Sequence, residues 1–322
     1  MRISVALATY NGAQFIEEQV ASILRGSRVP EEVVLADDGS TDNTVELVRA
    51  AFGGSRTSAQ LHVLPAQVRL GVTANFERAV SACTGDIIVL SDQDDVWHEY
   101  RLAVAERSFE ARPRLLLQHS DARLVDSAGK PLGVSLIDAL TVRAGERLAL
   151  DSGRAFQAYV RRNLATGATV AMRRKLIDLA APFPPEWVHD EWLAIIAAAL
   201  GEVEFVDSEL IDYRQHDSNQ IGVAKPTLSY RVGRMLEPRG ERFVLLSARS
   251  QILVDRLAAL PVAPGVLKLA EQKASFEARR AAMPDQRVRR LGAIVREVVR
   301  GSYGRLSSQG IIDVARDLIQ PV

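Results

Sequence analysis

Three aspartates stand close together in the segment LSDQDDVW, residues 90–97. They follow the run GDIIV, residues 85–89, which is typical of a buried strand, so the acids fall where that strand ends. Carboxylates this close repel one another, and a divalent cation with oxygen ligands is the usual way to stabilise such a cluster. A polar turn in which Asp95 caps the following helix fits the same residues. The segment alone leaves a metal site and a polar turn equally open.

Apolar runs and helical spacing predict that strands and helices alternate along the first third of the chain. Strands are expected at residues 3–8, 33–36, 61–64 and 87–90, and helices at 15–24, 45–52 and 71–82. This alternation predicts an α/β fold with a mainly parallel sheet, and right-handed crossovers place helices on both of its faces. Ligands of such sheets bind at the carboxyl ends of the strands.

Two further polar loops leave the ends of predicted strands. Tyr10 and Asn11 follow the first strand, and Asp37 and Asp38 follow the second. Together with the aspartates after the fourth strand, these loops should converge on one edge of the sheet. Gly12 stands alone, and neither glycine-rich phosphate motif occurs after the first strand. A bound phosphate is therefore expected to be held by a metal rather than by a glycine loop.

The composition limits the class of protein. The chain has 322 residues, of which 47% are hydrophobic, enough for one large α/β core with a smaller helical appendage. Its 40 basic and 40 acidic side chains cancel, so no nucleic-acid partner is expected. The single cysteine, Cys83, indicates a reducing compartment. Because no signal-peptide pattern and no apolar run of membrane-spanning length is found, we expect a soluble, cytoplasmic protein.

At this point the sequence resembles a known family. The resemblance is carried, in order, by residues 5–12 (VALATYNG), 34–42 (VLADDGSTD), 70–72 (LGV) with Asn75 and Phe76, 91–97 (SDQDDVW), 166–169 (TGAT), 189–193 (HDEWL) and 213–219 (YRQHDSN). These motifs resemble the family 2 glycosyltransferases, whose fold is the nucleotide-diphospho-sugar transferase type called GT-A. The form DQDDVW is similar to the rhamnosyltransferase-like branch that builds bacterial surface polysaccharides.

The resemblance implies a donor site on the first half of the chain. It assigns binding of the donor nucleotide to Ala8, Thr9, Tyr10, Asp38 and Asp92. A carboxylate such as that of Asp38 can accept a hydrogen bond from a base imide or a ribose hydroxyl, although helix capping explains Asp38 as well.

The family's metal ligands fall on Asp94, the second acid of its DxD element, and on His216, and the implied cofactor is Mg²⁺ or Mn²⁺. Such an ion would neutralise charge as the nucleotide leaves.

The resemblance also implies an acceptor side. Asp190 occupies the position of the family's catalytic acid and is the expected general base, with Gly167, Glu191 and Trp192 on the acceptor side. From the residues alone, a cap at the helix N-terminus is the favoured interpretation of Asp190. Trp192 fits a wall or core position better than a chemical role. Gly167 stands where the backbone must pass close to another group.

The second half carries fewer signals. Residues 115–125, followed by a turn cluster, predict a half-exposed hairpin added to the sheet, and residues 143–163 predict helices. We expect a GT-A domain over residues 1–224, with a donor half of about 1–112 and an acceptor half of about 113–224. Residues 225–322 should form a helical region.

Within that helical region, residues 287–296 place arginines beside an apolar face. Such a helix packs on its own domain or lies on an anionic membrane, which would make the protein peripheral at the inner face of the cell membrane.

The sequence thus predicts an inverting glycosyltransferase that moves a sugar, rhamnose being one candidate, from a dTDP- or UDP-linked donor to a glycan or lipid-linked glycan. One alternative is a sugar-phosphate nucleotidyltransferase, but residues 8–12 lack the Gly-rich, Arg-containing loop that it needs. A second is a non-catalytic module that binds the nucleotide sugar and metal without turnover.

Overall fold

The structure is a computed structural model that describes residues 1–66, 68–216, 239 and 241–321. The chain divides into two units: unit 1 comprises Met1–Ala155 and Leu164–Val223, and unit 2 comprises Phe156–Asn163 and Ala224–Val322. The helical pattern at residues 228–235, the motif residue Asn219 and the expected boundary at residue 224 lie outside the described residues.

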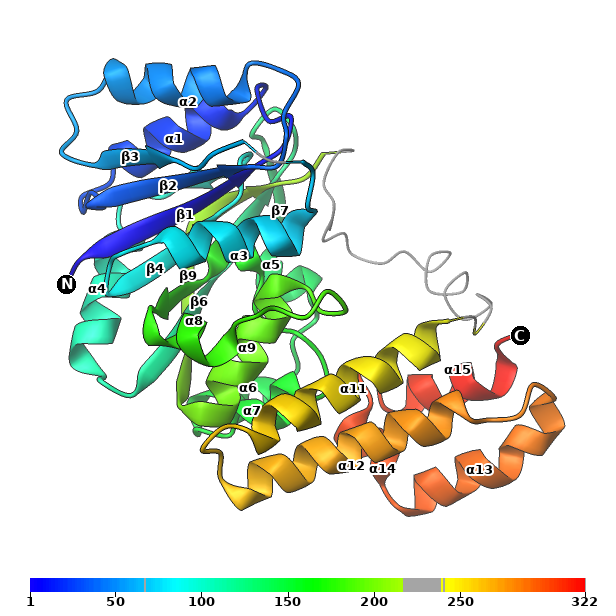
Figure 1. The fold of residues 1–322 in the computed structure, drawn as a ribbon. Helices are drawn as coiled ribbons and strands as arrows, with labels where there is room; N and C mark the ends of the chain where they lie inside the picture. The colour runs from blue at the N-terminus through cyan, green and yellow to red at the C-terminus, as the bar shows by residue number, and fades with distance from the viewer. Residues whose placement is uncertain (67, 217–238, 240, 322) are drawn as a thin grey trace. The chain divides into compact units, whose positions relative to one another are not determined.

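A mixed sheet forms the core of unit 1 (Figure 1). Its order is β3-β2-β1-β4-β8-β6-β9-β5, with β7 paired to β6. The strands are β1 (Ile3–Thr9), β2 (Glu32–Asp37), β3 (Gln60–Val63), β4 (Ile87–Ser91), β5 (Val96–Trp97), β6 (Leu115–Val125), β7 (Pro131–Ser135), β8 (Ala171–Arg173) and β9 (Glu202–Arg214). The four strands expected in the first third are confirmed, and β1 to β4 pair in parallel as predicted.

Helices cover both faces of this sheet. Those of unit 1 are α1 (Ile16–Leu24), α2 (Thr44–Gly53), α3 (Val72–Ala82), α4 (Arg101–Ala111), α5 (Leu136–Ala139), α6 (Ala144–Asp151), α8 (Lys175–Ala180) and α9 (His189–Leu200), with the 3-10 helix η1 (Gly167–Thr169). Figure 1 shows α1 and α2 on one side of β1 to β3 and α3 on the other. Every residue of β1 is buried because helices shield both of its faces.

The expectation of a half-exposed hairpin at residues 115–125 is wrong for its first strand. β6 is buried along almost its whole length and lies between β8 and β9 inside the sheet. Only β7, the second strand of that hairpin, is largely exposed. The polar residues of β6 suggested alternation, but several are buried in the sheet, including Gln118, His119 and Ser120. The prediction of an exposed strand was therefore wrong because the alternating polar residues of β6 are buried.

Unit 2 is helical. Its helices are α11 (Arg242–Ala258), α12 (Pro264–Ala281), α13 (Arg287–Val299), α14 (Ser302–Leu306) and α15 (Ile311–Ile319). Of α7 (Ala155–Tyr159), the first residue is assigned to unit 1 and the others to unit 2. Several amphipathic helices were expected here, and α11, α12 and α13 confirm them. None of the helices in the described part of the chain has the length and apolar character needed to cross a bilayer.

Ion pairs fill much of the interior of unit 2. The buried Arg280 binds Asp317 through two hydrogen bonds of 2.7 and 2.8 Å, and it also donates to Glu277 at 3.0 Å. The Tyr303 hydroxyl donates to the same Asp317 carboxylate at 2.7 Å, and Lys273 donates to Glu277 at 2.7 Å. Asp317 is fully buried. Its carboxylate thus joins α12, α14 and α15.

Replacing Asp317 by alanine should destabilise unit 2 by about 3–5 kcal/mol, because Arg280 is left buried without its bidentate partner. Hydrogen exchange of the α12 amides under increasing denaturant measures this loss. Asp255→Ala, at an exposed position of α11, is the matched control and should change stability by less than about 0.5 kcal/mol. Equal losses in both variants would show that the buried pair does not stabilise the unit.

Candidate active site

The loops after β1 and β4 are joined by one side chain. The Tyr10 amide donates to Gln93 Oε1 at 2.8 Å, and Gln93 Nε2 donates back to the Tyr10 carbonyl at 3.1 Å. A Cβ atom at Gly12 would clash with the Gln93 side-chain amide, so a larger residue there would displace Gln93 from these two hydrogen bonds. The predicted convergence of the two loops on one edge of the sheet is therefore observed.

Asp38 fixes the loop that precedes α3. Its buried carboxylate accepts from the amides of Leu70 at 2.6 Å and Gly71 at 2.9 Å. It does not cap α2, which was the alternative to a binding role. The guanidinium of Arg69, in the same loop, lies 3.9 Å from the centre of the Tyr10 ring. The loops after β1 and β2 and the loop before α3 thus lie together.

Ala8 and Thr9 close β1 beside β2. Ala8 is buried and pairs with Ala36, and the Thr9 hydroxyl donates to Asp37 at 2.7 Å. Asp37 also accepts from the amide and hydroxyl of Ser40 at 2.8 and 2.6 Å. These bonds shape the turn after β2. Contact of Ala8, Thr9, Tyr10 and Asp38 with a nucleotide stays a prediction.

The acids after β4 form an electrostatically strained cluster. Burial, together with the carboxylates of Asp94 and Asp190, raises the pKa of Asp92 to about 7. Burial also raises the pKa of Asp94, although a hydrogen bond between its Oδ2 and His216 Nε2, 2.8 Å long, opposes the shift. The His216 ring stacks on Phe15 at 4.9 Å between ring centres. The structure therefore brings the two predicted metal ligands into contact.

Asp95 does not cap a helix, and that interpretation is wrong. α4 begins only at Arg101, after β5, and Asp95 Oδ1 instead accepts from the Arg214 amide at 3.0 Å. Burial raises the pKa of Asp95 well above its ordinary value, and the neighbouring Asp94 and Asp92 add to the shift. Asp95 thus ties the acidic loop to the end of β9.

Two buried arginines support the acids, and sequence reasoning gave neither this role. Arg101 is buried next to the Trp97 ring, 4.3 Å from its centre, and donates to the Ala168 carbonyl at 2.6 Å. Burial lowers its pKa to about 9, while Asp95 and Asp92 oppose that shift. Arg214 donates to the Asp94 carbonyl at 2.8 Å and to Glu18 at 2.7 Å.

The expected acceptor side meets the same cluster through Asp190. The Gly167 amide donates to Asp190 Oδ2 at 2.9 Å, and the Glu191 amide donates to Oδ1 at 2.6 Å. Burial and the charge of Glu191 raise the pKa of Asp190 to about 7. A Cβ atom on Gly167 would lie 2.9 Å from His189 Nε2 and 3.5 Å from Asp190 Cβ. The close approach expected at Gly167 is therefore found, and its neighbour is the start of α9.

The other residues around the start of α9 differ in exposure. Trp192 is fully buried and donates to the Ala180 carbonyl at 2.8 Å, so it belongs to the core and does not face an acceptor. Glu191 is half-buried. His189 stacks on Phe76 at 4.0 Å, and its two ring nitrogens have no hydrogen-bond partner among the described residues. Burial lowers the His189 pKa to about 3, so the ring is neutral.

The donor set at Asp94 and His216 fits a divalent cation that shares its ligands with a substrate. Within the described ranges, no three His, Cys, Asp or Glu side chains are grouped to hold a metal by themselves. Mg²⁺ commonly binds through one or two carboxylates together with substrate phosphates, rather than in an all-protein cage. The raised pKa values of the acids also indicate a surplus of negative charge that a cation would offset.

The fold and these loops define a nucleotide-diphospho-sugar transferase of the GT-A type. Over 99% of this chain the structure is similar to residues 1–349 of S. aureus TarS, solved with UDP-GlcNAc, with a TM-score of 0.56, 15% identity and coverage of 90% of that chain. It is also similar to the mannosyltransferase PcManGT of Pyrobaculum calidifontis, solved with GDP-Man and Mn²⁺. There the TM-score is 0.52 at 21% identity, covering 98% of this chain and 85% of that one.

The chain belongs to glycosyl transferase family 2, whose profile matches residues 4–175. It is 26% identical over 227 residues to an uncharacterized glycosyltransferase of Nostoc sp., spanning 68% of this chain and 66% of that protein. It is 36% identical over 100 residues to the dTDP-rhamnosyl transferase RfbG of Shigella flexneri, spanning 30% of this chain and 34% of that protein. The chain thus spans just under two thirds of the first relative and about one third of the second.

Replacing Asp94 by asparagine should remove the dependence of nucleotide binding on Mn²⁺, because a neutral amide is a poor ligand for a hard dication. Titration calorimetry with UDP and dTDP, with and without Mn²⁺, measures the effect. We expect at least about a tenfold loss of affinity in the presence of the ion. The control is Glu99→Gln, an exposed acid near the same loop. An unchanged response to Mn²⁺ in Asp94→Asn would reject Asp94 as a ligand.

Replacing Gly167 by alanine should displace the start of α9 and with it Asp190, since the new methyl group would meet His189 at 2.9 Å. A displacement of about 1 Å at a reacting group can lower turnover about 100-fold, whereas donor binding should stay unchanged. Gly145→Ala on α6 is the matched control, because a Cβ atom there meets nothing within 4 Å. Parallel loss of donor affinity in Gly167→Ala would show that the two sides of the site are not separable.

Proposed function

We propose that the chain is an inverting glycosyltransferase that moves a sugar from a nucleotide-diphospho-sugar to an acceptor hydroxyl. The observation that supports this best is the meeting of Asp92 and Asp190 in one buried acidic site, where each has a pKa raised to about 7. One acid belongs to the family's donor motif and the other to its acceptor side. The group proposed to bind the donor nucleotide and the group proposed to take the acceptor proton would therefore act in one site.

In the proposed reaction the acceptor oxygen attacks the anomeric carbon as the bond from that carbon to the diphosphate breaks. The electron pair of the broken bond leaves with the nucleoside diphosphate, and the acceptor proton passes to the Asp190 carboxylate. A pKa near 7 suits this role, because about half of the groups are ionised at neutral pH and the carboxylate is still basic enough to take a proton. One displacement inverts the anomeric carbon.

Asp94 and His216 would hold Mg²⁺ or Mn²⁺ at the donor diphosphate. When bound, the ion offsets the negative charge that develops on the departing phosphate. Tyr10, Asp38 and Asp92, with the end of β1 at Ala8 and Thr9, would hold the nucleotide. The presence of Mn²⁺ and GDP-Man in the Pyrobaculum neighbour, which shares the fold, agrees with such a donor site.

The donor sugar is proposed to be a deoxyhexose such as rhamnose, on dTDP or UDP, and the acceptor a glycan or lipid-linked glycan of surface polysaccharide synthesis. The partial identity to a dTDP-rhamnosyl transferase supports the sugar. A lipid-linked acceptor would also give a reason for contact between unit 2 and a membrane. Thermal stabilisation by a panel of nucleotide sugars, each with and without Mn²⁺, tests the donor.

A non-catalytic binding module is the competing function. It would be stabilised by the same nucleotide sugars but would release no nucleoside diphosphate in the presence of acceptor or water. Measuring diphosphate release with each stabilising donor therefore separates binding from turnover.

Asp190→Asn should lower kcat by about 10²- to 10⁴-fold while donor and metal binding persist, since an amide has nearly the same shape but cannot act as a base. In the parent enzyme, kcat/KM should fall about tenfold per unit as the pH drops below about 7, where Asp190 takes up a proton. In the variant the part of this limb that is due to Asp190 should be absent, and any acid limb left by Asp92 should lie at lower pH, because the charge of Asp190 no longer raises the pKa of Asp92.

Glu191→Gln is the control for the Asp190 variant. It should keep the rate, and its acid limb should persist but move to lower pH, because the charge of Glu191 raises the pKa of Asp190. If Glu191→Gln is inactive and Asp190→Asn is not, the base is Glu191. If both variants are active, the two acids serve only the N-terminus of α9.

A further inference from the structure

α13 turns an apolar stripe toward solvent. Its exposed aliphatic side chains recur at helical spacing, so they line one side of the helix. They are Val288, Leu291, Val295, Val298 and Val299, and the two most exposed, Val288 and Val299, retain 79% and 82% of their surface. Monomeric proteins rarely leave a continuous apolar patch of this kind uncovered.

The opposite face of α13 buries charged groups. Arg290 is fully buried and donates to the carbonyls of Pro284, Asp285 and Gln320 at 2.7 to 2.8 Å. Glu297 is buried as well and binds two arginines of its own unit. Apart from Ile294, which packs in the apolar core of unit 2, the helix is therefore inverted relative to an ordinary surface helix, with charges inside and aliphatic groups outside.

α15, which packs against α13, is inverted in the same way. It buries Asp313, Arg316 and Asp317 and exposes Ile311 and Ile312, the first of which is 78% exposed. Two neighbouring helices thus share one arrangement. We call the exposed aliphatic residues of α13, namely Val288, Leu291, Val295, Val298 and Val299, the aliphatic face, and the exposed Ile311 and Ile312 belong to its neighbour α15.

The exposed charges on α13 itself are all basic, and the exposed Asp285 lies just before the helix. Arg287, Arg289 and Arg296 of α13 are exposed, whereas the acids of α13 and α15 are all buried. An apolar surface with an arginine border is complementary to an anionic bilayer, where aliphatic groups enter the acyl boundary and arginines meet lipid phosphates. A symmetric contact between two copies would instead bring like charges together.

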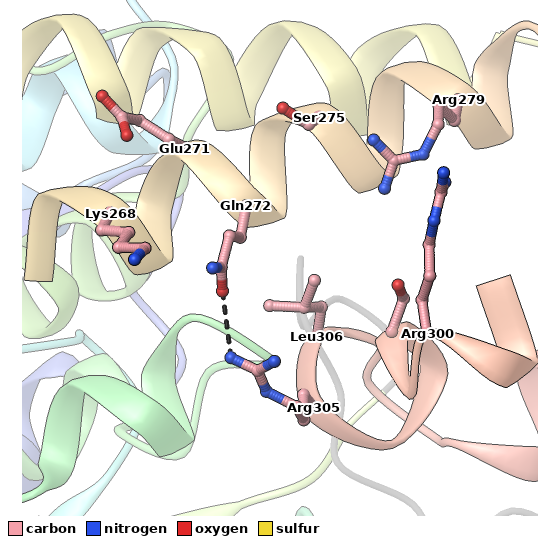
Figure 2. Close-up of a pocket in the computed structure, with 9 residues that line it drawn as sticks. Lys268, Glu271, Gln272, Ser275, Arg279, Arg300, Arg305 and Leu306 are labelled. Atoms are coloured by element: carbon pink, nitrogen blue, oxygen red, sulfur yellow. Dashed lines mark hydrogen bonds between the residues drawn. The ribbon is translucent and has the colours of Figure 1, made fainter. Parts of the chain in front are cut away.

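A basic cavity of about 460 Å³ adjoins the end of α13 (Figure 2). Its lining includes Lys268, Arg279, Arg300 and Arg305 but only one acid, Glu271. Arg300 is the residue that ends α13, so the cavity begins where the apolar stripe stops. Figure 2 shows the guanidinium groups of Arg279 and Arg300 pointing toward one another. Both are held by Glu297, at 2.8 and 2.7 Å.

The charge on Glu297 keeps this arrangement fixed. Burial would raise its pKa, but hydrogen bonds from Arg279, Ser302 and Arg300 outweigh burial and lower the pKa to about 2. Glu297 therefore stays ionised and neutralises one of the two guanidinium charges. The cations of the cavity outnumber its acids, so its chemistry fits a phosphate group.

We propose that the aliphatic face docks on an anionic bilayer and that the basic cavity takes the phosphate of a lipid headgroup. This proposal names the surface through which unit 2 would contact a membrane. It rests on the proposed function only for the reason that such a contact would be useful. Its test needs neither donor nor acceptor.

The test measures sedimentation of the full chain with vesicles of phosphatidylcholine alone and of phosphatidylcholine with phosphatidylglycerol in equal parts. We expect binding to the anionic vesicles and at least about tenfold weaker binding to the neutral ones. The double variant Val295→Glu, Val299→Glu should reduce anionic binding at least about tenfold, because charge is placed where the helix enters the lipid. Val244→Glu, at an exposed valine of α11, is the matched control and should bind like the parent.

A second part of the experiment tests the basic cavity. Arg305→Glu should weaken binding to anionic vesicles, and inorganic phosphate alone should not raise the melting temperature of the parent. Stabilisation by free phosphate that Arg305→Glu abolishes, without vesicle binding, would replace the lipid by a soluble anion and overturn the proposal.

Two other outcomes would also overturn it: equal vesicle binding by the parent and the double variant, or a dimer in analytical centrifugation that the double variant dissolves while vesicles are not bound. A chain that binds vesicles but releases no nucleoside diphosphate would reject the proposed function alone. Transfer activity without vesicle binding would reject only the docking surface.

Discussion

Repulsion among buried carboxylates is the constraint on which unit 1 depends. Asp92, Asp94, Asp95 and Asp190 raise one another's pKa or lie in a site where burial does so. Such a cluster is stable only if the surrounding protein supplies compensating donors and cations. His216, the amides of Arg214 and Gly167, and the buried Arg101 provide them. These groups do not fully offset the negative charge of the four carboxylates. The remaining negative charge favours binding of a cation together with a phosphate ligand.

The same contacts join the donor and acceptor sides. Arg101 holds the Ala168 carbonyl of η1, while the preceding residue, Gly167, holds Asp190 through its amide. One arginine and one turn of backbone therefore link the acidic loop to the expected base. Both partners are backbone groups, which vary little in position, so the distance between the two sides is set by the fold rather than by flexible side chains.

Features that depend on local pattern were predictable, and features that depend on distant packing were not. The strands β1 to β4 and the acids at their ends follow from apolar runs and turn residues, and a motif resemblance pointed to Asp190 and His216. The role of Arg101 could not be found, because a lone arginine at the start of a helix is ordinarily exposed. β6 was misplaced because its polar residues are satisfied by burial within the sheet, which no local period reveals. Asp95 was misassigned because its partner, Arg214, is 119 residues away.

The interiors of the two units differ. In unit 1 aliphatic strands fill the core and charges gather at the edge of the sheet. In unit 2 the apolar core around Phe276 is joined by the buried charges of Arg280, Arg290 and Asp317, while the valines of α13 are exposed. Buried ion pairs seldom stabilise a fold more than aliphatic packing would, so stability alone does not explain this choice. Ion pairs do, however, satisfy their partners in only one arrangement. Rotation of α13 about its axis would turn its valines toward the interior. The buried hydrogen bonds of Arg290 and Glu297 oppose this rotation, because it would leave both charged side chains without their partners. The buried charges thus keep the apolar surface of α13 exposed, as the proposed contact with a bilayer requires.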